Sequence, residues 1–277
     1  MDPPAHNGPM TDAHDWSRAA VGTRRIGHAI EHHATLGSTN DRARQLLDRE
    51  GGEGVAVVAD HQSAGRGRRG RTWLSPPRRN LMVSVAVRPR LDQSRAGLLG
   101  IAAAVAVRDA CADAVPGDAL GLRWPNDVVS ADRLKLAGLL VETTLVGERV
   151  VEAVIGVGIN ANWRRADMPP EIAERATSLA DLAGTDVDRV ALLAGLLERL
   201  DLHVGRLEAG DTPVGRFRDA SVLDGRAVLV EVGEERLEGT AAGIADDGAL
   251  LLDTSAGRIA LSVGEVVAVR DVAGAVA

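Results

Sequence analysis

The sequence predicts an α+β protein, with a mixed β-sheet flanked by helices and then a small all-β domain. Up to about residue 220, β-branched runs alternate with alanine- and leucine-rich stretches of helical length. From residue 221 onward, short apolar runs are separated by glycine and aspartate turns. With 277 residues, of which 45% are hydrophobic, the chain can bury a full core and carry a smaller companion domain.

The chain opens with a segment unlike the rest. Residues 1–20 are rich in proline, histidine, glycine and aspartate, which predicts a disordered tail. We place a large domain after it, at residues 21–220. Its first predicted helix begins after Ser38, a favourable N-cap residue, and stops at Gly51.

Within the large domain, apolar runs predict strands and longer amphipathic or alanine-rich stretches predict helices. The predicted strands are residues 55–60, 80–88 (an alternating run), 121–129 (interrupted by Pro125), 135–145 and 150–160. The predicted helices are residues 94–114, 169–183 and 188–209. The all-β domain, residues 221–277, is predicted to hold five strands at 226–232, 235–244, 249–254, 257–262 and 265–270.

Composition excludes several classes of protein. No run of about 18 apolar residues could span a bilayer, and the N-terminal residues lack the order of a signal peptide. We therefore expect a cytoplasmic protein. A single cysteine, Cys111, excludes an internal disulfide and a cysteine-based metal cage. A formal net charge of −7 argues against general binding of nucleic acid, although a local basic patch is compatible with it.

One such patch is the run GRGRRGR at residues 65–71. Between Gln62 and Arg79 the chain has six arginines and no acid. The run matches the pattern G-x-G-x-x-G, but TWLSPP follows it instead of the helix that a dinucleotide site needs. A protein kinase is excluded because the chain has no DFG and no HRD motif.

Two interpretations of this run remain, a solvated charge run or a polyphosphate site. Glycines let backbone amides approach phosphate oxygens, and arginine forks bind them bidentately. Because four like charges repel, we expect residues 64–75 to be mobile until an anion binds.

Lysine is a second compositional signal. The chain holds 31 arginines but one lysine, Lys135. Either codon usage explains this, or the position requires a compact ammonium in place of a planar guanidinium.

Five motifs together resemble the catalytic domain of biotin–protein ligases. They are GSTN (37–40), HQSAGRGRRGRTW (61–73), RWPND (123–127), KLAGLLVE (135–142) and GVGIN (156–160). The resemblance covers about residues 35–270 and implies a catalytic domain like those of class II aminoacyl-tRNA synthetases and biotin ligases, with a small C-terminal SH3-like β-barrel. It implies a monofunctional ligase that makes biotinyl-5′-AMP from biotin and ATP, with Mg²⁺, and transfers biotin to a lysine of a biotin carboxyl carrier protein.

The same resemblance implies roles for individual residues. Lys135, Arg66, Arg68 and Arg71 would be catalytic, with Lys135 on the α-phosphate and the arginines as a mobile clamp. The implied biotin-binding residues are Ser38, Thr39, Asn40, Gln62, Gly65, Arg66, Lys135 and Gly138. The implied ATP- or adenylate-binding residues are Arg68, Arg69, Arg71, Trp73, Asn126, Asp127, Lys135 and Asn160, with Trp163 as an alternative to Trp73. Asp127 is the candidate neighbour of Mg²⁺.

Several of these residues have plainer interpretations. Ser38 and Thr39 fit a helix cap, the residues around Asn126 fit a turn, and either tryptophan fits core packing. Arg123 stands where the family usually has lysine, which leaves that contact open. Only about 30 residues precede the ligase motifs, fewer than a DNA-binding winged helix needs, so we expect no DNA binding. We expect a monomer or a weak homodimer.

Two rival functions remain. A lipoate–protein ligase or octanoyltransferase shares the core architecture, and its transferase route uses a cysteine. Cys111 lies between two alanines in a predicted helix, so we expect it to be buried. A nucleic-acid-binding module would use the arginine patch with stacking aromatics, but aromatic residues make up 2% of the chain.

Overall fold

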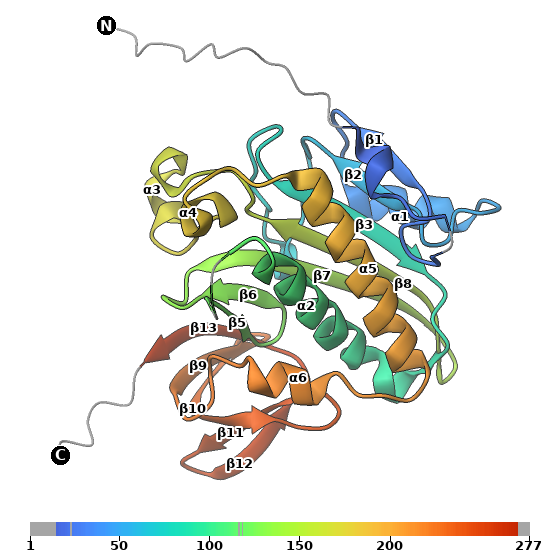
Figure 1. The fold of residues 1–277 in the computed structure, drawn as a ribbon. Helices are drawn as coiled ribbons and strands as arrows, with labels where there is room; N and C mark the ends of the chain where they lie inside the picture. Colours follow the sequence, from blue (N-terminus) through green and yellow to red (C-terminus); the bar gives the residue numbers. More distant parts are fainter. Residues whose placement is uncertain (1–14, 23, 116, 118, 271–277) are drawn as a thin grey trace, which may run out of the picture.

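A computed structural model describes residues 15–270 apart from 23, 116 and 118, and shows two β-sheets with helices packed on the larger one (Figure 1). The α-helices are α1 (Thr39–Leu47), α2 (Ala96–Ala112), α3 (Pro170–Ala173), α4 (Leu179–Ala183), α5 (Arg189–Glu208) and α6 (Val214–Asp219). The strands of the large sheet are β1 (Ile30–His33), β2 (Ala56–Ala59), β3 (Leu81–Val87), β4 (Leu91–Asp92), β5 (Leu120–Arg123), β6 (Asp127–Ser130), β7 (Lys135–Val146) and β8 (Arg149–Ile159). The strands of the small sheet are β9 (Ala227–Val232), β10 (Glu235–Ile244), β11 (Leu250–Thr254), β12 (Gly257–Leu261) and β13 (Glu265–Arg270).

The large sheet is mixed, as predicted. Its strands follow the order β1-β2-β3-β8-β7-β6-β5, and the short β4 pairs with β8. The pair β1–β2 is parallel, whereas β2–β3, β3–β8 and β7–β8 are antiparallel. The long β7–β8 hairpin therefore forms the centre of the sheet.

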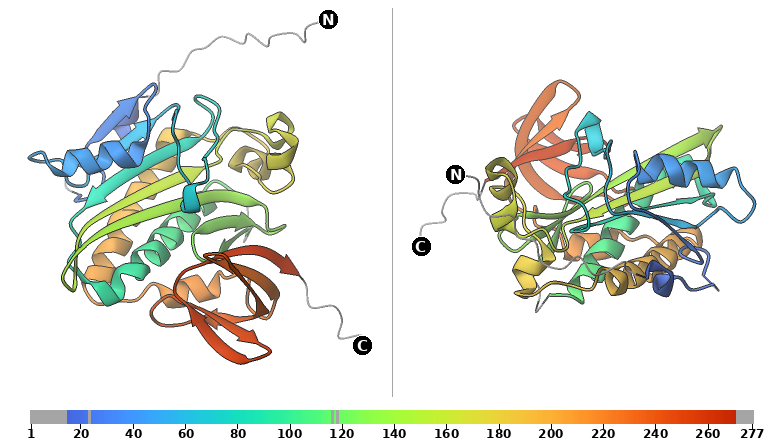
Figure 2. Two further views of the ribbon diagram at one scale, coloured as in Figure 1. Left: turned by 180° about the vertical axis from the view of Figure 1, so that it is seen from behind. Right: turned by 90° about the horizontal axis from the view of Figure 1, so that it is seen from above.

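Helices α2 and α5 lie side by side across one face of this sheet (Figure 1). Alternate residues of β8 point to this face: Ile155 and Val157 join the core that α2 and α5 complete. Val154 points to the other face and packs beneath α1. Seen from above, α1 lies across the sheet from α2 and α5 (Figure 2, right). Because α1 covers only one end of this second face of the large sheet, the rest of that face is available for a site.

The strand predicted at residues 80–88 differs from expectation in its burial. Every residue of β3 is buried, although the sequence alternates. Its polar position, Ser84, lies under α1 and donates its hydroxyl hydrogen within a network described below. Both faces of β3 are covered, so the alternation here does not mark a solvent face.

Three predicted elements need correction. Residues 121–129 form the antiparallel hairpin β5–β6 and not one strand, because the turn at residues 124–126 reverses the chain. The helix predicted at 169–183 is two short helices, α3 and α4. The helix predicted to stop at Gly51 ends at Leu47, and Ser38, although at its N-cap, makes no side-chain capping bond.

The predicted disordered tail was also too long. Residues Trp16–Ala19 form a 3₁₀ helix, η1, and Trp16 is buried with 4% of its surface exposed. Arg189 lies over its ring, with the guanidinium carbon 5.2 Å from the ring centroid. Residues 1–14 lie outside the described residues. The boundary between the two domains, at residue 220, stays a prediction.

The five strands predicted in the C-terminal domain are confirmed. They form an antiparallel sheet of order β12-β11-β10-β9-β13, an SH3-like arrangement. Over the described residues, the pairing leaves the sheet open between β12 and β13, so the predicted barrel is not closed. The sheet lies beside the large one, with α6 packed against β10 (Figures 1 and 2). No helix in the described part of the chain is long and apolar enough to cross a membrane.

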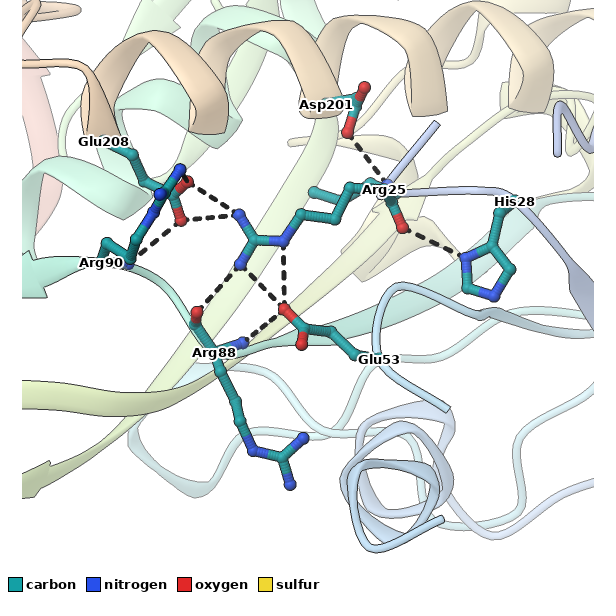
Figure 3. Close-up of polar contacts among 8 residues, drawn as sticks. Arg25, His28, Glu53, Arg88, Arg90, Asp201 and Glu208 are labelled. Atoms are coloured by element: carbon teal, nitrogen blue, oxygen red, sulfur yellow. Dashed lines mark hydrogen bonds and ion pairs between the residues drawn. The ribbon is translucent and has the colours of Figure 1, made fainter. Parts of the chain in front are cut away.

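A polar network ties the N-terminal segment to the end of α5 (Figure 3). The Arg25 guanidinium donates to both oxygens of Glu208, at 2.7 and 2.8 Å, and to Glu53 at 2.8 and 3.0 Å. Glu208 also accepts a bond of 3.1 Å from the backbone N–H of Arg90. Only 4% of the Glu208 side chain is exposed, so this carboxylate depends on its partners in place of water.

We expect Glu208→Gln to lower the free energy of unfolding by about 1–3 kcal/mol, because it removes a charged acceptor from a fork-like pair. Urea denaturation of the wild type and the variant would measure this loss. The matched control is Glu198→Gln on the same helix, whose side chain is 63% exposed and pairs with Arg24. An exposed pair of this kind contributes about 0–1 kcal/mol. Equal losses in the two variants would contradict the expectation.

Candidate active site

A cavity of about 430 Å³ opens on the sheet face opposite α2 and α5. It lies between α1, the segment at residues 64–75 (the arginine loop) and the edge of the small sheet. Most of the residues singled out in the sequence line it, including those from all five motifs. These are Ser38, Thr39, Asn40, Gln62, Arg66, Arg68, Arg71, Trp73, Arg123, Asn126, Asp127, Lys135, Gly138, Asn160 and Trp163.

One end of the cavity is a network of uncharged polar groups at the start of α1. The Gln62 side-chain oxygen accepts from the Thr39 backbone N–H at 2.8 Å and from its hydroxyl at 3.1 Å. The Ser84 hydroxyl lies 2.7 Å from Thr39 Oγ1 and 2.6 Å from Asn40 Oδ1. Gln62 therefore caps the helix in place of Ser38. Ser84 was not predicted from the sequence, because nothing there distinguishes it from an ordinary strand residue.

Asn40 is held against β8 at a glycine, where the strand has no side chain. Its amide nitrogen donates to Glu142 at 2.8 Å, and its oxygen lies 2.1 Å from where a Cβ on Gly156 would stand. Gly156 is thus required by the close approach of Asn40 to the strand. This glycine stands within the motif GVGIN, but sequence reasoning gave it no role.

Trp73 covers the middle of the cavity. A Cβ on Gly158 would stand 2.5 Å from its indole ring, and one on Gly138 would stand 3.2 Å away. The Lys135 ammonium lies 5.7 Å from the ring centroid, a cation–π distance. The indole N–H is buried and has no hydrogen-bond partner among the described residues. Trp73 therefore packs on the two glycines and offers a donor that the protein itself leaves unused.

The other end of the cavity is a buried carboxylate between two cations. Lys135 Nζ lies 2.6 Å from Asp127 Oδ1, and Arg123 Nη2 donates to Asp127 Oδ2 at 2.8 Å. Burial by itself would raise the pKa of Asp127, but the charges of Lys135 and Arg123 outweigh it and hold that pKa below its usual value. Asp127 is therefore an anion at neutral pH, and whether Arg123 replaces the family lysine stays an open prediction.

These contacts also test Asp127 as a neighbour of Mg²⁺. Both of its oxygens already face cations. The described residues contain no group of three or more His, Cys, Asp or Glu side chains that could hold a metal. The described side chains alone therefore form no magnesium site, and Asp127 as a neighbour of Mg²⁺ that arrives with ATP stays a prediction.

The arginine loop is anchored by carboxylates and backbone oxygens. Arg66 forms a two-bond pair with Asp41, at 2.5 and 2.7 Å. The others bind the small sheet: Arg69 pairs with Glu231 at 3.0 Å, Arg71 pairs with Glu265, and Arg68 donates to Gly264 O at 3.1 Å. Carboxylates therefore offset the repulsion at Arg66, Arg69 and Arg71, and the mobility of residues 64–75 without an anion stays a prediction.

Arg68 is the loop arginine placed deepest. It also donates to the Asn126 side-chain oxygen at 3.3 Å, and Asn126 in turn donates to Leu139 O at 2.5 Å. Burial lowers the pKa of the Arg68 guanidinium below its ordinary value, although arginine stays charged at any physiological pH. Asn126 therefore lies in a turn and also lines the cavity, and its role toward ATP stays a prediction.

Asn160 and Trp163 close the cavity near residues 172–176. Asn160 donates to Thr177 O at 3.1 Å and accepts from Asn80 at 3.4 Å, so its amide is already engaged. Trp163 is 7% exposed, packs with Met168 and donates to Asp167 O at 3.2 Å. The core-packing interpretation therefore fits Trp163 better than it fits Trp73.

Two predicted site residues do not line the cavity. Arg69 points to Glu231 and Gly233 on the small sheet. Gly65 lies beneath the backbone of Trp73, where a Cβ would stand 2.8 Å from its carbonyl oxygen. Conversely, Glu265 and Val266 of the small sheet line the cavity, as do Ile172 and Arg175. They carry no local sequence signal, since only the fold brings them to the motifs.

Cys111 is buried in α2, on the opposite face of the sheet from the cavity. Burial raises the pKa of its thiol to about 12. A thiolate nucleophile at this position is thus excluded, as the sequence suggested.

Comparison with known proteins gives a consistent result. Residues 34–160 match the model of the biotin/lipoate A/B protein ligase family, and residues 225–268 match that of the biotin protein ligase C-terminal domain. The chain is 37% identical over 243 residues to biotin–[acetyl-CoA-carboxylase] ligase from Mycobacterium tuberculosis, which covers 86% of this chain and 88% of that protein. It is 33% identical over 244 residues to the bifunctional ligase/repressor BirA of Bacillus subtilis, which covers 87% of this chain and 74% of that protein.

Among solved structures, biotin protein ligase from Aquifex aeolicus in complex with biotin and ATP matches with a TM-score of 0.72 and 28% identity. The match covers 88% of this chain and 99% of that one. The ligase from Leishmania major in complex with biotinyl-5-AMP matches with a TM-score of 0.56 and 25% identity.

Proposed function

This chain belongs to the biotin–protein ligase family, and we infer from that premise that it is an ATP-dependent ligase acting on biotin. It forms biotinyl-5′-AMP from biotin and ATP and then transfers biotin to a lysine of a biotin carboxyl carrier protein. One observation supports the residue roles proposed below. A single cavity has an uncharged hydrogen-bonding end at Thr39 and Gln62 and a cationic end at Lys135 and Arg68. That polarity matches a neutral cyclic urea joined through a carboxylate to a phosphate.

We propose that the uncharged end binds the head of biotin. Ser38, Thr39, Asn40 and Gln62 supply both donors and acceptors, as a urea group needs. Thr39 and Gln62 already bond each other, so the pair is held in place before a ligand arrives. Such preorganisation reduces the entropy lost on binding.

We propose that the cationic end governs the first step. The biotin carboxylate attacks the α-phosphorus of ATP, a phosphoric anhydride bond breaks, and pyrophosphate leaves. No protein nucleophile is needed, so the protein contributes position and positive charge. In this proposal Lys135, which contacts Asp127 and Trp73, neutralises charge on the α-phosphate, and Arg68 and Arg71 of the same cavity assist it.

In the second step the amine of the carrier lysine attacks the carbonyl carbon of the mixed anhydride. An amide bond forms, and AMP leaves with the electron pair of the broken carbon–oxygen bond. We propose that Mg²⁺ enters with the phosphates of ATP, a common mode for this cation. We further propose that the protein acts in the cytoplasm, binds no DNA, and is a monomer or weak homodimer.

The direct test incubates the protein with biotin, Mg²⁺ and α-labelled ATP and follows labelled biotinyl-adenylate. Lipoate or octanoate replaces biotin in parallel reactions. Labelled adenylate with biotin alone is the expected result. Preference for lipoate would establish the runner-up function, and no adenylate with any of the three acids would contradict the proposal.

A further expectation concerns retention of the intermediate. Arg68→Ala removes a half-buried cation that bridges Asn126 and Gly264 at the edge of the small sheet, so we expect biotinyl-adenylate to dissociate about tenfold faster, the equivalent of about 1.4 kcal/mol. Stopped-flow displacement of the adenylate by excess biotin would measure it. The control is Arg236→Ala, an exposed arginine that pairs with Glu231 away from the cavity. Identical release rates in the wild type and Arg68→Ala would refute this role.

A further inference from the structure

Two buried asparagines meet where strands β3 and β8 pair. The register of this antiparallel pair sets Leu81 opposite Ile159. Asn80, just before β3, therefore stands opposite Asn160, just after β8. Asn80 is 1% exposed and Asn160 is 5% exposed. Asn160 lines the cavity, whereas Asn80 is not among the described residues that line it, and the five sequence motifs leave it out.

Backbone groups at its two ends orient this asparagine pair. The Ala161 N–H can only donate, and it donates to Asn80 Oδ1 at 3.0 Å, so Asn80 must turn its NH₂ group the other way. That group donates to Asn160 Oδ1 at 3.4 Å. The Asn160 NH₂ group then donates at 3.1 Å to the Thr177 carbonyl oxygen, which can only accept. Each side chain therefore has one orientation, because the reversed one would oppose like groups.

Asn80 is itself held by a buried cation. Arg189, with 2% of its side chain exposed, donates to the Asn80 carbonyl oxygen at 2.9 Å. Its guanidinium also lies 3.7 Å from Asp60 and over the Trp16 ring. A hydrogen bond from a charged donor is stronger than one between neutral groups. The Asn80 end of the pair is thus fixed without any ligand.

The pair leaves half of the Asn160 amide for a ligand. An asparagine amide has two N–H donors and two acceptor lone pairs, and the two bonds of Asn160 use one of each. The other N–H and the other lone pair have no partner among the residues that the structure describes. A donor beside an acceptor complements adenine, which carries its amino group beside a ring nitrogen.

We propose that Asn80 is a positioning residue that sets the nucleobase selectivity of the ligase, by fixing the direction in which Asn160 presents its amide to adenine. The inference rests on the proposed function, because it needs ATP in the cavity. Inosine triphosphate carries a carbonyl oxygen where adenine has its amino group. The fixed oxygen of Asn160 would accept from the amino group but would face that carbonyl oxygen with no hydrogen between them. An Asn160 amide free to turn over would pair with either base.

The experiment compares ATP with inosine triphosphate in the activation of biotin, followed by release of pyrophosphate. The selectivity ratio is kcat/KM for ATP divided by kcat/KM for inosine triphosphate, and the wild type should favour ATP. Asn80→Asp keeps the shape and the bond from the Ala161 N–H, but its second oxygen repels Asn160 Oδ1. We expect the selectivity ratio to fall by about tenfold, the effect of one lost hydrogen bond. The KM for biotin should stay near that of the wild type.

Asn162→Asp is the matched control for a purely structural effect. The Asn162 amide donates to Val187 O at 3.0 Å and accepts from the Val187 N–H at 2.8 Å, and Asn162 is not among the described residues that line the cavity. Both substitutions replace an NH₂ donor with an oxygen, and urea denaturation reports the stability that each one loses. Only Asn80→Asp should change the selectivity ratio.

Asn80→Ala introduces no buried charge and should lower the selectivity ratio in the same direction, so it decides the matter if Asn80→Asp does not fold. No product from biotin and ATP in the wild type would mean that the proposed function is wrong. Product with ATP but no preference for ATP over inosine triphosphate would overturn the inference alone. An unchanged ratio in the Asn80 variants, or an equal fall in Asn162→Asp, would also overturn it.

Discussion

Lys135→Ala is expected to slow adenylate formation by about 10²–10³-fold, the typical cost of one electrostatic donor in a transition state. The ammonium is held by Asp127 at the cationic end of the cavity, where the proposed mechanism has charge grow during attack on the α-phosphorus. Its contribution is therefore larger in the transition state than in the bound substrates. Biotin affinity should change far less than rate. Single-turnover formation of labelled adenylate, beside equilibrium binding of biotin, measures the two effects separately.

Two controls separate the charge of Lys135 from its shape and from the second step. Lys135→Arg keeps the positive sign but replaces the compact ammonium with a planar fork, so it should also be slow. Supplying preformed biotinyl-adenylate bypasses the first barrier, so transfer to the carrier should be impaired less than adenylation. Wild-type adenylation in Lys135→Ala would remove Lys135 from the catalytic residues. An exposed lysine without a role would shift stability by within about 0.5 kcal/mol and leave the rate unchanged.

Gly156→Ala is expected to raise the KM for biotin by about 10²-fold, since displacing a positioned group by about 1 Å has an effect of that size. A Cβ at Gly156 would stand 2.1 Å from Asn40 Oδ1. Asn40 cannot turn aside without losing its bonds to Ser84 and Glu142, which fix both ends of its amide. The KM for ATP should change much less, because the cations proposed to bind phosphate lie at the other end of the cavity. Steady-state kinetics with each substrate varied in turn would show the difference.

Gly100→Ala is the matched control for this substitution. Gly100 lies in α2, and a Cβ added there would meet nothing within 4 Å. Alanine is a better helix former than glycine, so the control should gain about 0.5–1 kcal/mol of stability and keep wild-type kinetics. Unchanged biotin KM in Gly156→Ala would show that Asn40 has no part in the biotin end of the site.

Much of the fold could be predicted because its strands are short, apolar and bounded by turn residues. The five strands of the small sheet were located within a residue or two for this reason. β1 was missed because its sequence, IEHH, has no apolar pattern and becomes a strand only through parallel pairing with β2. The helix predicted at 169–183 was divided because its middle residues instead pair with Lys135 through backbone bonds. In each miss, tertiary contact outweighed local propensity.

The site could be predicted in part because the motifs that form it are local and chemically distinctive. Most of the residues they singled out line one cavity. Glu265 could not be found this way, because it comes from the last strand and meets Arg71 only when the two sheets pack together. Glu231, the partner of Arg69, was hidden for the same reason, whereas Arg66 finds Asp41 on α1 of the large domain. A run of like charges gives no indication in sequence of the carboxylates that neutralise it.

The two faces of the large sheet impose two kinds of packing requirement. Residues of β8 that point toward α2 and α5 belong to the main core, whereas Gly156 and Gly158 on the opposite face make room for Asn40 and Trp73. Along one strand, neighbouring positions therefore meet different demands: core packing at Ile155 and Val157, and room for the cavity side chains at Gly156 and Gly158. A library that varies only the cavity face leaves the main apolar core unaltered. This strand is a suitable starting point for directed evolution toward other carboxylic acids.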